Sequence, residues 1–296
     1  MTAGGRDTAW LRMMPAVFVL IWSTGFIVAR YGMPYAPPLK FLAVRYAFSV
    51  LCFGLWIAVA RVAWPQKREQ WLHLMVTGIL MQAGYLGGVW AAVKAGMGSG
   101  LIALLVGIQP VLTAVWLSLN GGAITRRQWA GLLLGFAGLV LVVSRKLGQG
   151  GEVTIVSMSL AILALLSITA GTLYQKRFVE PCDVRSASAV QLAAALVVTL
   201  PFALLESDAI VWNAAVMGSL AWSVLALSLG GSSLLYMLIQ RGTATAVTSL
   251  LYLVPPTTAV MAWLLFDEPI TLTTLAGIAM TAVGVSLVVR GDGAPA

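Results

Sequence analysis

Apolar runs of about 20 residues recur along the whole chain, separated by short connectors rich in proline, glycine and charge. A run of this length suffices for an α-helix to cross the hydrocarbon core, because each residue advances it by about 1.5 Å. The connectors at Ala95–Met97 and at Arg241–Gly242 are so short that they predict tight hairpins. The pattern predicts an all-α membrane protein of ten transmembrane helices, at residues 13–31, 39–60, 71–93, 98–119, 127–145, 155–177, 186–205, 215–239, 244–265 and 272–290.

The composition supports this interpretation and indicates which classes of partner to expect. Hydrophobic residues make up 60% of the chain and charged residues 9%, whereas soluble domains carry about 25% charged residues. The net charge of +8 arises from basic residues at helix ends, where they face anionic lipid headgroups. We therefore expect membrane lipid as a partner and no nucleic acid. Cys52 and Cys182 fit no metal or disulfide pattern, so neither a metal nor a cofactor is expected.

Lysine and arginine positions predict the orientation. Arg6 and Arg12 precede the first apolar run, which has no cleavage site behind it, and we interpret it as a retained helix rather than a signal peptide. Of the 18 Lys and Arg residues, twelve fall on the side of the N-terminus and six on the other. The positive-inside rule then predicts that both termini lie in the cytoplasm. We expect the protein in the cell membrane, that is, the inner or plasma membrane.

An internal repeat divides the chain. At an offset of 146 residues, Pro110 aligns with Pro256. Further matches are Ile124–Thr125 with Ile270–Thr271, Ala130–Gly131 with Ala276–Gly277, Gly138 with Gly284, and Leu141–Val143 with Leu287–Val289. A repeat of five helices must enter the membrane from the opposite side in its second copy, which is the architecture of many secondary transporters. The predicted units are an N-terminal cytoplasmic tail (1–12), a first repeat (13–146), a connector (147–154), an inverted second repeat (155–290) and a C-terminal tail (291–296).

Several short motifs resemble the drug/metabolite transporter superfamily, in particular its EamA-type members, over essentially the whole chain. They are the opening of the first helix at Ile21–Phe26, the Arg-aromatic pair in Ala43–Tyr46, and the turn Phe266–Pro269 with its acidic residue Glu268. The first half departs from the last motif, because Gly122 stands at the equivalent position. The resemblance implies a ten-helix carrier of two five-helix repeats that exports amino acids, aromatic or hydrophobic ones in particular, or related metabolites.

Prolines mark the middle of two predicted helices. Pro110, Pro255 and Pro256 remove backbone hydrogen bonds at matched positions in the two repeats. They are either hinges for alternating access or static kinks that shape packing.

Hydroxyl and aromatic side chains recur at helical spacing on several predicted helices. Rings and hydroxyls around one cavity would suit a zwitterion with an apolar side chain, although small polar residues also serve ordinary helix packing. The candidate cavity residues are Trp22, Ser23, Phe26, His73, Thr77, Tyr85, Ser167, Tyr174, Ser232, Tyr236, Ser249 and Tyr252.

Acidic residues are missing from the predicted spans, since all ten lie in tails, connectors or helix ends. We therefore expect no buried carboxylate relay and transport by facilitated diffusion or weakly coupled exchange. His73 is the only histidine and fits an interfacial or packing position as well as a proton relay. Arg45 either snorkels, pairs within a helix interface, or meets a substrate carboxylate.

Other functions stay open. A drug-efflux pump would need an embedded glutamate, and a sugar-phosphate or nucleotide-sugar carrier would need Lys or Arg in the cavity, for which Lys94 and Arg45 are candidates. An intramembrane enzyme would need a catalytic dyad or metal cluster, which the sequence lacks; we expect no enzymatic activity. The partner is expected to be a small-molecule substrate, and the sequence does not decide between a monomer and a homodimer.

Overall fold

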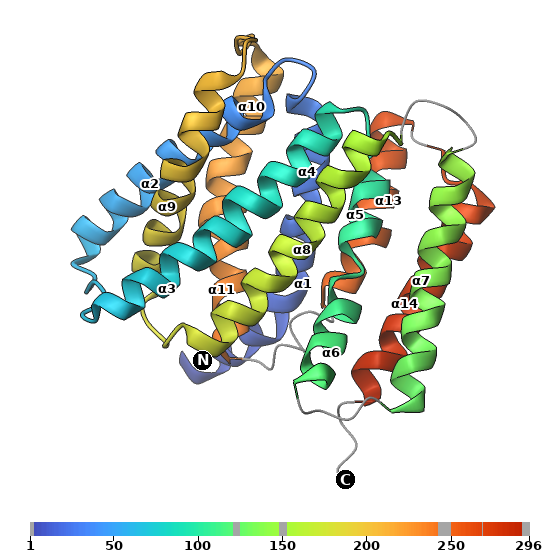
Figure 1. The fold of residues 1–296 in the computed structure, drawn as a ribbon. Helices are drawn as coiled ribbons and strands as arrows, with labels where there is room; N and C mark the ends of the chain where they lie inside the picture. The colour runs from blue at the N-terminus through green and yellow to red at the C-terminus, as the bar shows by residue number, and fades with distance from the viewer. Residues whose placement is uncertain (1–2, 121–124, 148–152, 242–249, 268, 292–296) are drawn as a thin grey trace.

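The computed structural model describes residues 3–120, 125–147, 153–241, 250–267 and 269–291, and in these ranges all regular structure is helical (Figure 1). The α-helices are α1 (Ala3–Gly32), α2 (Pro38–Ala60), α3 (Arg68–Gly78), α4 (Tyr85–Lys94), α5 (Ser99–Val106), α6 (Gln109–Leu119), α7 (Arg126–Leu147), α8 (Ile155–Phe178), α9 (Val184–Leu205), α10 (Ala214–Trp222), α11 (Ser233–Arg241), α13 (Val254–Phe266) and α14 (Leu272–Gly291). The other helical elements are the π-helices η1 (Ile79–Gly84) and η2 (Ser223–Ser232) and the 3₁₀-helix η3 (Leu251–Leu253).

Seven helical stretches in the described residues are long and apolar enough to cross a membrane, and each coincides with a predicted span. They are Met13–Gly32, Pro38–Ala60, Arg68–Lys94, Ser99–Leu119, Ile155–Phe178, Val184–Leu205 and Ala214–Gln240. Helices also occupy the regions of the other three predicted spans, as α7, α13 and α14. The ten-span count and the orientation of the termini stay predictions. The hairpin at Ala95–Met97 is present, whereas the one at Arg241–Gly242 reaches beyond the described residues.

Local chemistry sets several helix ends. Pro38 begins α2 at the first helical position, where a missing N–H costs nothing. Thr154 and Ser157 form a reciprocal capping box at the start of α8, and Asp183 caps α9.

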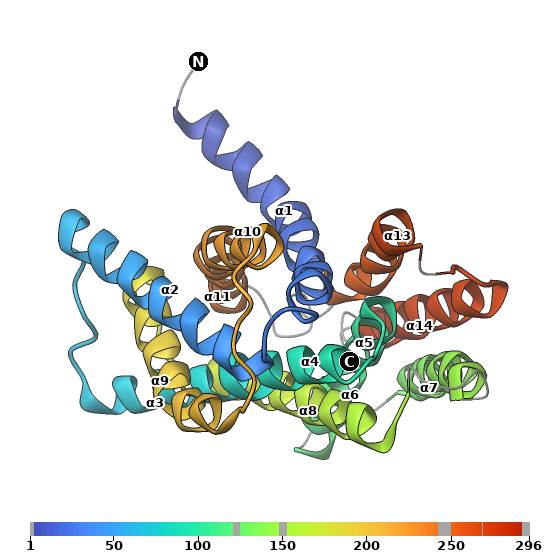
Figure 2. The ribbon, with the colours of Figure 1, turned by 90° about the horizontal axis from the view of Figure 1, so that it is seen from above.

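The Glu206 carboxylate, after the end of α9, accepts from the backbone N–H groups of residues 39 and 40 at 3.0 and 2.7 Å. This carboxylate therefore joins the ends of α2 and α9, two helices that pack together (Figure 2).

Two long spans contain a π-helical segment. η1 lies between α3 and α4, and η2 lies between α10 and α11, so each span is continuous but changes its hydrogen-bond register. The 146-residue offset of the repeat aligns Ile79–Gly84 in sequence with residues 225–230, which lie inside η2. The two repeats thus carry the same irregularity at the same place, and π-segments often occur at functional sites.

The prolines predicted to bend helices lie just after breaks. α5 ends at Val106 and α6 begins at Gln109, with Pro110 in its first turn. In the second half η3 ends at Leu253, and Pro255 and Pro256 follow in the first turn of α13. The break before α6 and the break before α13 are in contact, since a Cβ atom added to Gly107 would lie 2.6 Å from Cγ of Pro255.

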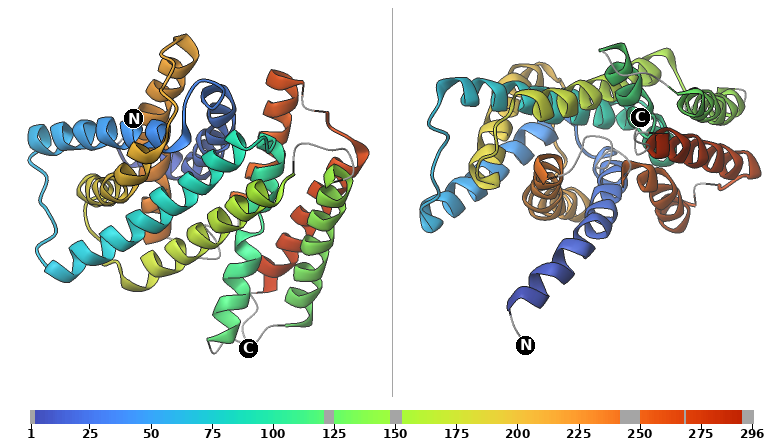
Figure 3. Two further views of the ribbon diagram at one scale, coloured as in Figure 1. Left: turned by 45° about the horizontal axis from the view of Figure 1, so that its top comes forward. Right: turned by 90° about the horizontal axis from the view of Figure 1, so that it is seen from below.

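α7 and α14 form a pair at one side of the bundle and run in opposite directions (Figures 1 and 3). Their glycines allow the backbones to touch. A Cβ atom on Gly138 would lie 2.8 Å from the carbonyl oxygen of Gly277, and one on Gly284 would lie 2.5 Å from that of Gly131. The 146-residue offset relates Gly131 to Gly277 and Gly138 to Gly284, so the two contacts are equivalent by the repeat. Close approach through small residues is the usual way in which membrane helices associate.

Candidate functional site

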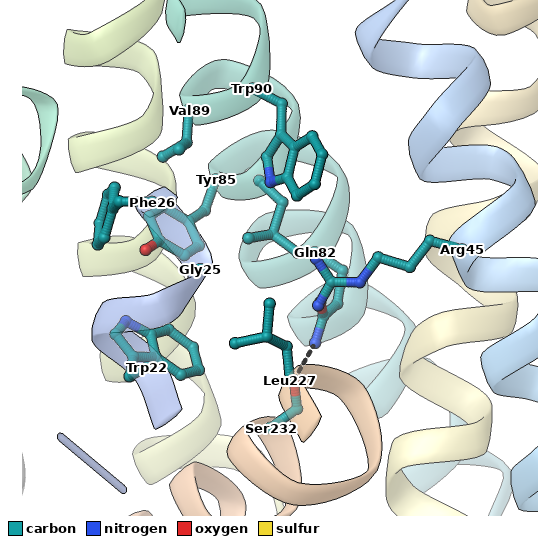
Figure 4. A pocket seen from close by; sticks show the side chains of 11 residues that line it. Trp22, Gly25, Phe26, Arg45, Gln82, Tyr85, Val89, Trp90, Leu227 and Ser232 are labelled. Atoms are coloured by element: carbon teal, nitrogen blue, oxygen red, sulfur yellow. Dashed lines mark hydrogen bonds between the residues drawn. The ribbon is translucent and has the colours of Figure 1, made fainter. Parts of the chain in front are cut away.

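A narrow cavity lies where helices from both halves of the chain meet. Its volume is about 30 Å³, which is room for one or two water molecules. The first half contributes α1, α2, η1 and α4, and the second half contributes η2 (Figure 4). The lining residues are Trp22, Gly25, Phe26, Arg45, Gln82, Tyr85, Leu86, Val89, Trp90, Leu227 and Ser232.

Aromatic rings form one wall of the cavity. Trp22 of α1 and Tyr85 of α4 stack with their ring centroids 6.1 Å apart and an angle of 2° between the planes. Phe18 lies one turn before Trp22, and the centroids of their two rings are 5.2 Å apart. Trp90 of α4 stacks on Phe41 of α2 with the ring centroids 4.6 Å apart, so the two helices are in contact here. These contacts hold the rings in place and leave their remaining surface as an apolar lining.

Polar groups form the opposite wall, and most come from the π-helical segments. Nε of Arg45 donates to the Ser228 hydroxyl at 3.1 Å. The side-chain amide of Gln82 donates to the Ser232 hydroxyl at 3.3 Å, and the backbone carbonyl oxygen of Gln82 accepts from the Tyr46 hydroxyl at 2.7 Å. Ser228 and Ser232 lie in η2 and Gln82 lies in η1. The network therefore links the first half of the chain to the second across the cavity.

The guanidinium of Arg45 is buried, with 2% of the residue exposed, and one of its terminal nitrogens, Nη1, has no hydrogen-bond partner. None of the described residues that line the cavity carries a carboxylate. The acidic side chains that the structure describes all lie in connectors or at helix ends: Glu69, Glu180, Asp183, Glu206, Asp208 and Asp267. The cavity thus combines an aromatic wall with a positive charge that no described acidic side chain neutralises.

Four of the predicted cavity residues meet at this site, namely Trp22, Phe26, Tyr85 and Ser232. Ser23 follows Trp22 but is fully buried, and its hydroxyl donates to the Val19 carbonyl oxygen inside α1.

Three other predicted residues form a separate group, with His73 and Thr77 in the second half of α3 and Tyr174 near the end of α8. Nδ1 of His73 and the hydroxyl of Tyr174 are 2.8 Å apart, and the imidazole stacks on Phe178. The buried Thr77 hydroxyl donates to the His73 carbonyl oxygen within α3. None of the three lines the narrow cavity.

The remaining candidates lie elsewhere or outside the described part. Ser167 of α8 packs against Gly84, where an added Cβ would lie 2.6 Å from its hydroxyl oxygen. Tyr236 is buried, and its hydroxyl is 3.1 Å from Sγ of Cys182. Ser249 lies outside the described residues, as does the side chain of Tyr252.

A larger groove of about 640 Å³ lies between α6 and α8. Its wall includes Trp116 and Leu119, which are 52% and 77% exposed, and its lining is almost wholly apolar. A groove of this kind on the outside of a membrane protein faces acyl chains. We therefore take the smaller, buried and polar cavity as the candidate site, despite the difference in size.

Gln82 and Trp90 line the cavity but were not among the residues predicted from the sequence, and three roles were open for Arg45. A signal for Gln82 was available, because a polar amide within an apolar span is costly and usually faces the interior of a bundle. Trp90 carries no such signal, since the sequence does not distinguish a cavity-facing indole from one that faces lipid.

Comparisons with known proteins agree with the sequence motifs. The family model of the EamA-like transporter family matches residues 12–144 and 155–290. An uncharacterized transporter YvbV of Bacillus subtilis is 28% identical over 281 residues, covering 93% of this chain and 90% of that protein. A probable amino-acid metabolite efflux pump of Salmonella typhimurium is 24% identical over 284 residues, covering 92% of each. An uncharacterized inner membrane transporter of Escherichia coli, YedA, is 26% identical over 258 residues, covering 85% of this chain and 81% of that protein.

A solved structure titled "Crystal structure of protein" has a TM-score of 0.69 and 16% identity, and it covers 95% of this chain and 98% of that one. At this identity the likeness concerns the fold alone.

Proposed function

This chain belongs to the EamA-like transporter family, and on that premise we propose that it exports amino acids with aromatic or hydrophobic side chains, or closely related metabolites, through the cavity between its two halves. The observation that carries the proposal is the composition of the cavity walls. Trp22 and Tyr85 offer ring surface on one side, whereas Arg45, Gln82 and Ser232 offer polar groups on the other. Such a site matches a solute that has an apolar ring at one end and charge at the other.

Alternating access between two inverted repeats is the proposed mechanism. The two family matches divide the chain into two segments of similar length. The antiparallel pairing of α7 with α14 supports inversion, because reciprocal contacts between repeat-related residues are what a two-fold axis across the helices produces. Such an axis lies in the membrane plane when the helices cross the membrane, as in other carriers of this architecture.

The size of the cavity supports a change of conformation during transport. A volume of about 30 Å³ does not admit an amino acid, so the helices must separate to load one. The breaks before Pro110 and Pro255 are suitable hinges, because backbone geometry can change there without breaking a continuous helix. Their contact through Gly107 would couple the two movements.

The names of relatives support the amino-acid class. The Salmonella typhimurium protein and another from Escherichia coli, which is 23% identical over 291 residues, are both called probable amino-acid metabolite efflux pumps. Those names describe the relatives, and we extend the substrate class to this chain on the basis of its cavity.

The alternative substrate classes fit the cavity less well. A lipophilic cation would meet the positive charge of Arg45 and none of the described carboxylates. A phosphorylated sugar or nucleotide sugar would profit from several cations, but Lys94 does not line the cavity; its ammonium donates to the Met33 carbonyl oxygen at 2.9 Å at the exposed end of α4. We place the protein in the inner membrane with both termini in the cytoplasm, which the excess of basic residues on that side supports.

Counterflow in proteoliposomes tests the proposal. Vesicles loaded with an unlabelled amino acid should accumulate the same labelled amino acid transiently, and phenylalanine, tyrosine, tryptophan and leucine should give larger signals than glucose 6-phosphate or a lipophilic cation. Protein-free vesicles are the control. A signal from the phosphate ester or the cation alone would contradict the proposed substrate class.

A further inference from the structure

We propose that Arg45 is the anchor for the carboxylate of the transported solute, so that the site recognises the acid group and does not require the amino group. The inference rests on the proposed function, because it assigns a chemical group of the substrate to one side chain of that cavity.

Arg45 is buried beside the cavity. It lies in α2, within a membrane span, and its side chain extends toward Gln82 and the cavity (Figure 4). The residue is 2% exposed, so snorkelling to the membrane surface does not describe it. The hydrogen bond from Nε to Ser228 fixes the guanidinium plane, while Nη1 is buried without a partner. A directed donor is therefore left free beside the cavity.

Arg45 has no negatively charged partner among the described residues. A buried guanidinium is costly unless a negative group compensates it, and membrane-embedded charges usually pair with one another or mark a solute pathway. Its described hydrogen bond goes to a neutral hydroxyl, and every carboxylate with a described side chain lies at a helix end or in a connector. The substrate is then the natural source of the negative charge.

The geometry of a guanidinium selects the anion. Its planar fork of N–H donors matches the two oxygens of a carboxylate. A phosphate monoester carries up to two negative charges, whereas among the described residues that line the cavity Arg45 is the only basic one. The single cation favours a monocarboxylate.

The amino group of the substrate has a weaker partner. The rings of Trp22 and Tyr85 could face an ammonium ion, but such contacts are weaker than a charge-assisted pair with a carboxylate. A carboxylic acid without an amino group should therefore bind, whereas an amine without a carboxylate should not.

Thermal-shift titration of the purified full-length protein tests this with four probes of similar size: phenylalanine, 3-phenylpropanoate, 2-phenylethylamine and phenylalaninamide. The two carboxylates should raise the melting temperature of the wild-type protein, and the amine and the amide should not. Phenyl phosphate is the fifth probe and should bind more weakly than 3-phenylpropanoate. An equal shift with 2-phenylethylamine, or a larger one with phenyl phosphate, would overturn the anchor.

Variants locate the effect. Arg45→Gln should weaken carboxylate binding by roughly 10- to 100-fold, and Arg45→Lys should weaken it less because the charge is kept. Ser228→Ala removes the partner of Nε and should produce a smaller loss for carboxylates. Lys94→Gln is the matched control, because it removes one positive charge at the end of α4, away from the cavity. Unchanged carboxylate affinity in Arg45→Gln would refute the proposal.

The outcomes separate this inference from the proposed function. If wild-type vesicles show counterflow of phenylalanine and of 2-phenylethylamine alike, transport stands and the carboxylate anchor is wrong. If none of the probes binds and phenylalanine shows no counterflow, both are wrong. If Arg45→Gln does not fold, the wild-type comparison of acid, amine and amide and the Arg45→Lys variant still decide.

Discussion

Replacing Gly284 by alanine tests the pairing of α7 and α14, on which the inverted arrangement depends. The added Cβ would lie 2.5 Å from the carbonyl oxygen of Gly131 and 2.6 Å from the backbone nitrogen of Gly135. Both neighbours are backbone atoms of α7, so no side chain can turn aside and the helices must separate. Overpacking of this kind costs about 1–3 kcal/mol, which corresponds to a fall in melting temperature of roughly 2–6 °C for a chain of this size.

The assay is a melting curve of the detergent-solubilised protein, followed by size-exclusion chromatography after heating. Gly54→Ala is the control, since nothing lies within 4 Å of a Cβ atom at that position in α2, and it should melt within about 1 °C of wild type. Gly138→Ala should resemble Gly284→Ala. The double variant should lose less than the sum of the two losses, because one separation of the helices relieves both contacts. A Gly284→Ala protein that melts like Gly54→Ala would refute the direct backbone contact.

Two further predictions concern the helix ends and the helix breaks. Arg185 donates to the Asp183 carboxylate and holds its pKa below the ordinary value, so this pair stabilises the fold above the ordinary carboxyl pKa and loses its effect as the pH falls through the lower folded pKa. Asp183→Asn keeps a capping oxygen but removes the charge, so it should melt below wild type at pH 7, and the difference should shrink as the pH falls below the ordinary carboxyl pKa; equal melting temperatures at pH 7 would contradict the pairing. Gly107→Ala would place Cβ 2.6 Å from the Pro255 ring and should slow counterflow by roughly tenfold with a melting temperature within a few degrees of wild type. Normal counterflow would show that the contact between the breaks does not govern transport.

The sequence predicts the membrane spans well because hydropathy alone determines them. The seven described helical stretches that are long and apolar enough to cross a membrane begin and end within a few residues of the predicted limits. Hydropathy does not register a break inside an apolar run, however. Residues 98–119 were expected as one helix bent at Pro110, whereas the structure ends a helix at Val106 and starts another at Gln109. The proline fits the first turn of the new helix, where its missing N–H is harmless.

Candidate residues on the third and eighth predicted helices separate for a physical reason. Placing them on one face assumed 3.6 residues per turn throughout. η2 instead bonds each residue to the one five positions away, which rotates the later part of the helix relative to the earlier part. η1 lies between His73 and Tyr85 and rotates the one relative to the other. Ser232, the last residue of η2, lines the cavity, whereas Tyr236, four residues later in α11, contacts Cys182. No residue pattern in a single sequence announces a π-segment, because tertiary packing stabilises it.

The central claim is that solute passes through the cavity beside Tyr85, and a matched pair of variants tests it most directly. Tyr85 and Tyr236 are both buried, at 2% and 3% exposure, and only Tyr85 lines the cavity. We expect Tyr85→Ala to reduce phenylalanine counterflow by roughly tenfold or more, because the ring it stacks on loses its partner and the cavity loses its wall. Tyr236→Ala, reconstituted at the same amount, should keep most of the wild-type signal. Equal counterflow in the two variants, or a loss confined to Tyr236→Ala, would contradict the account.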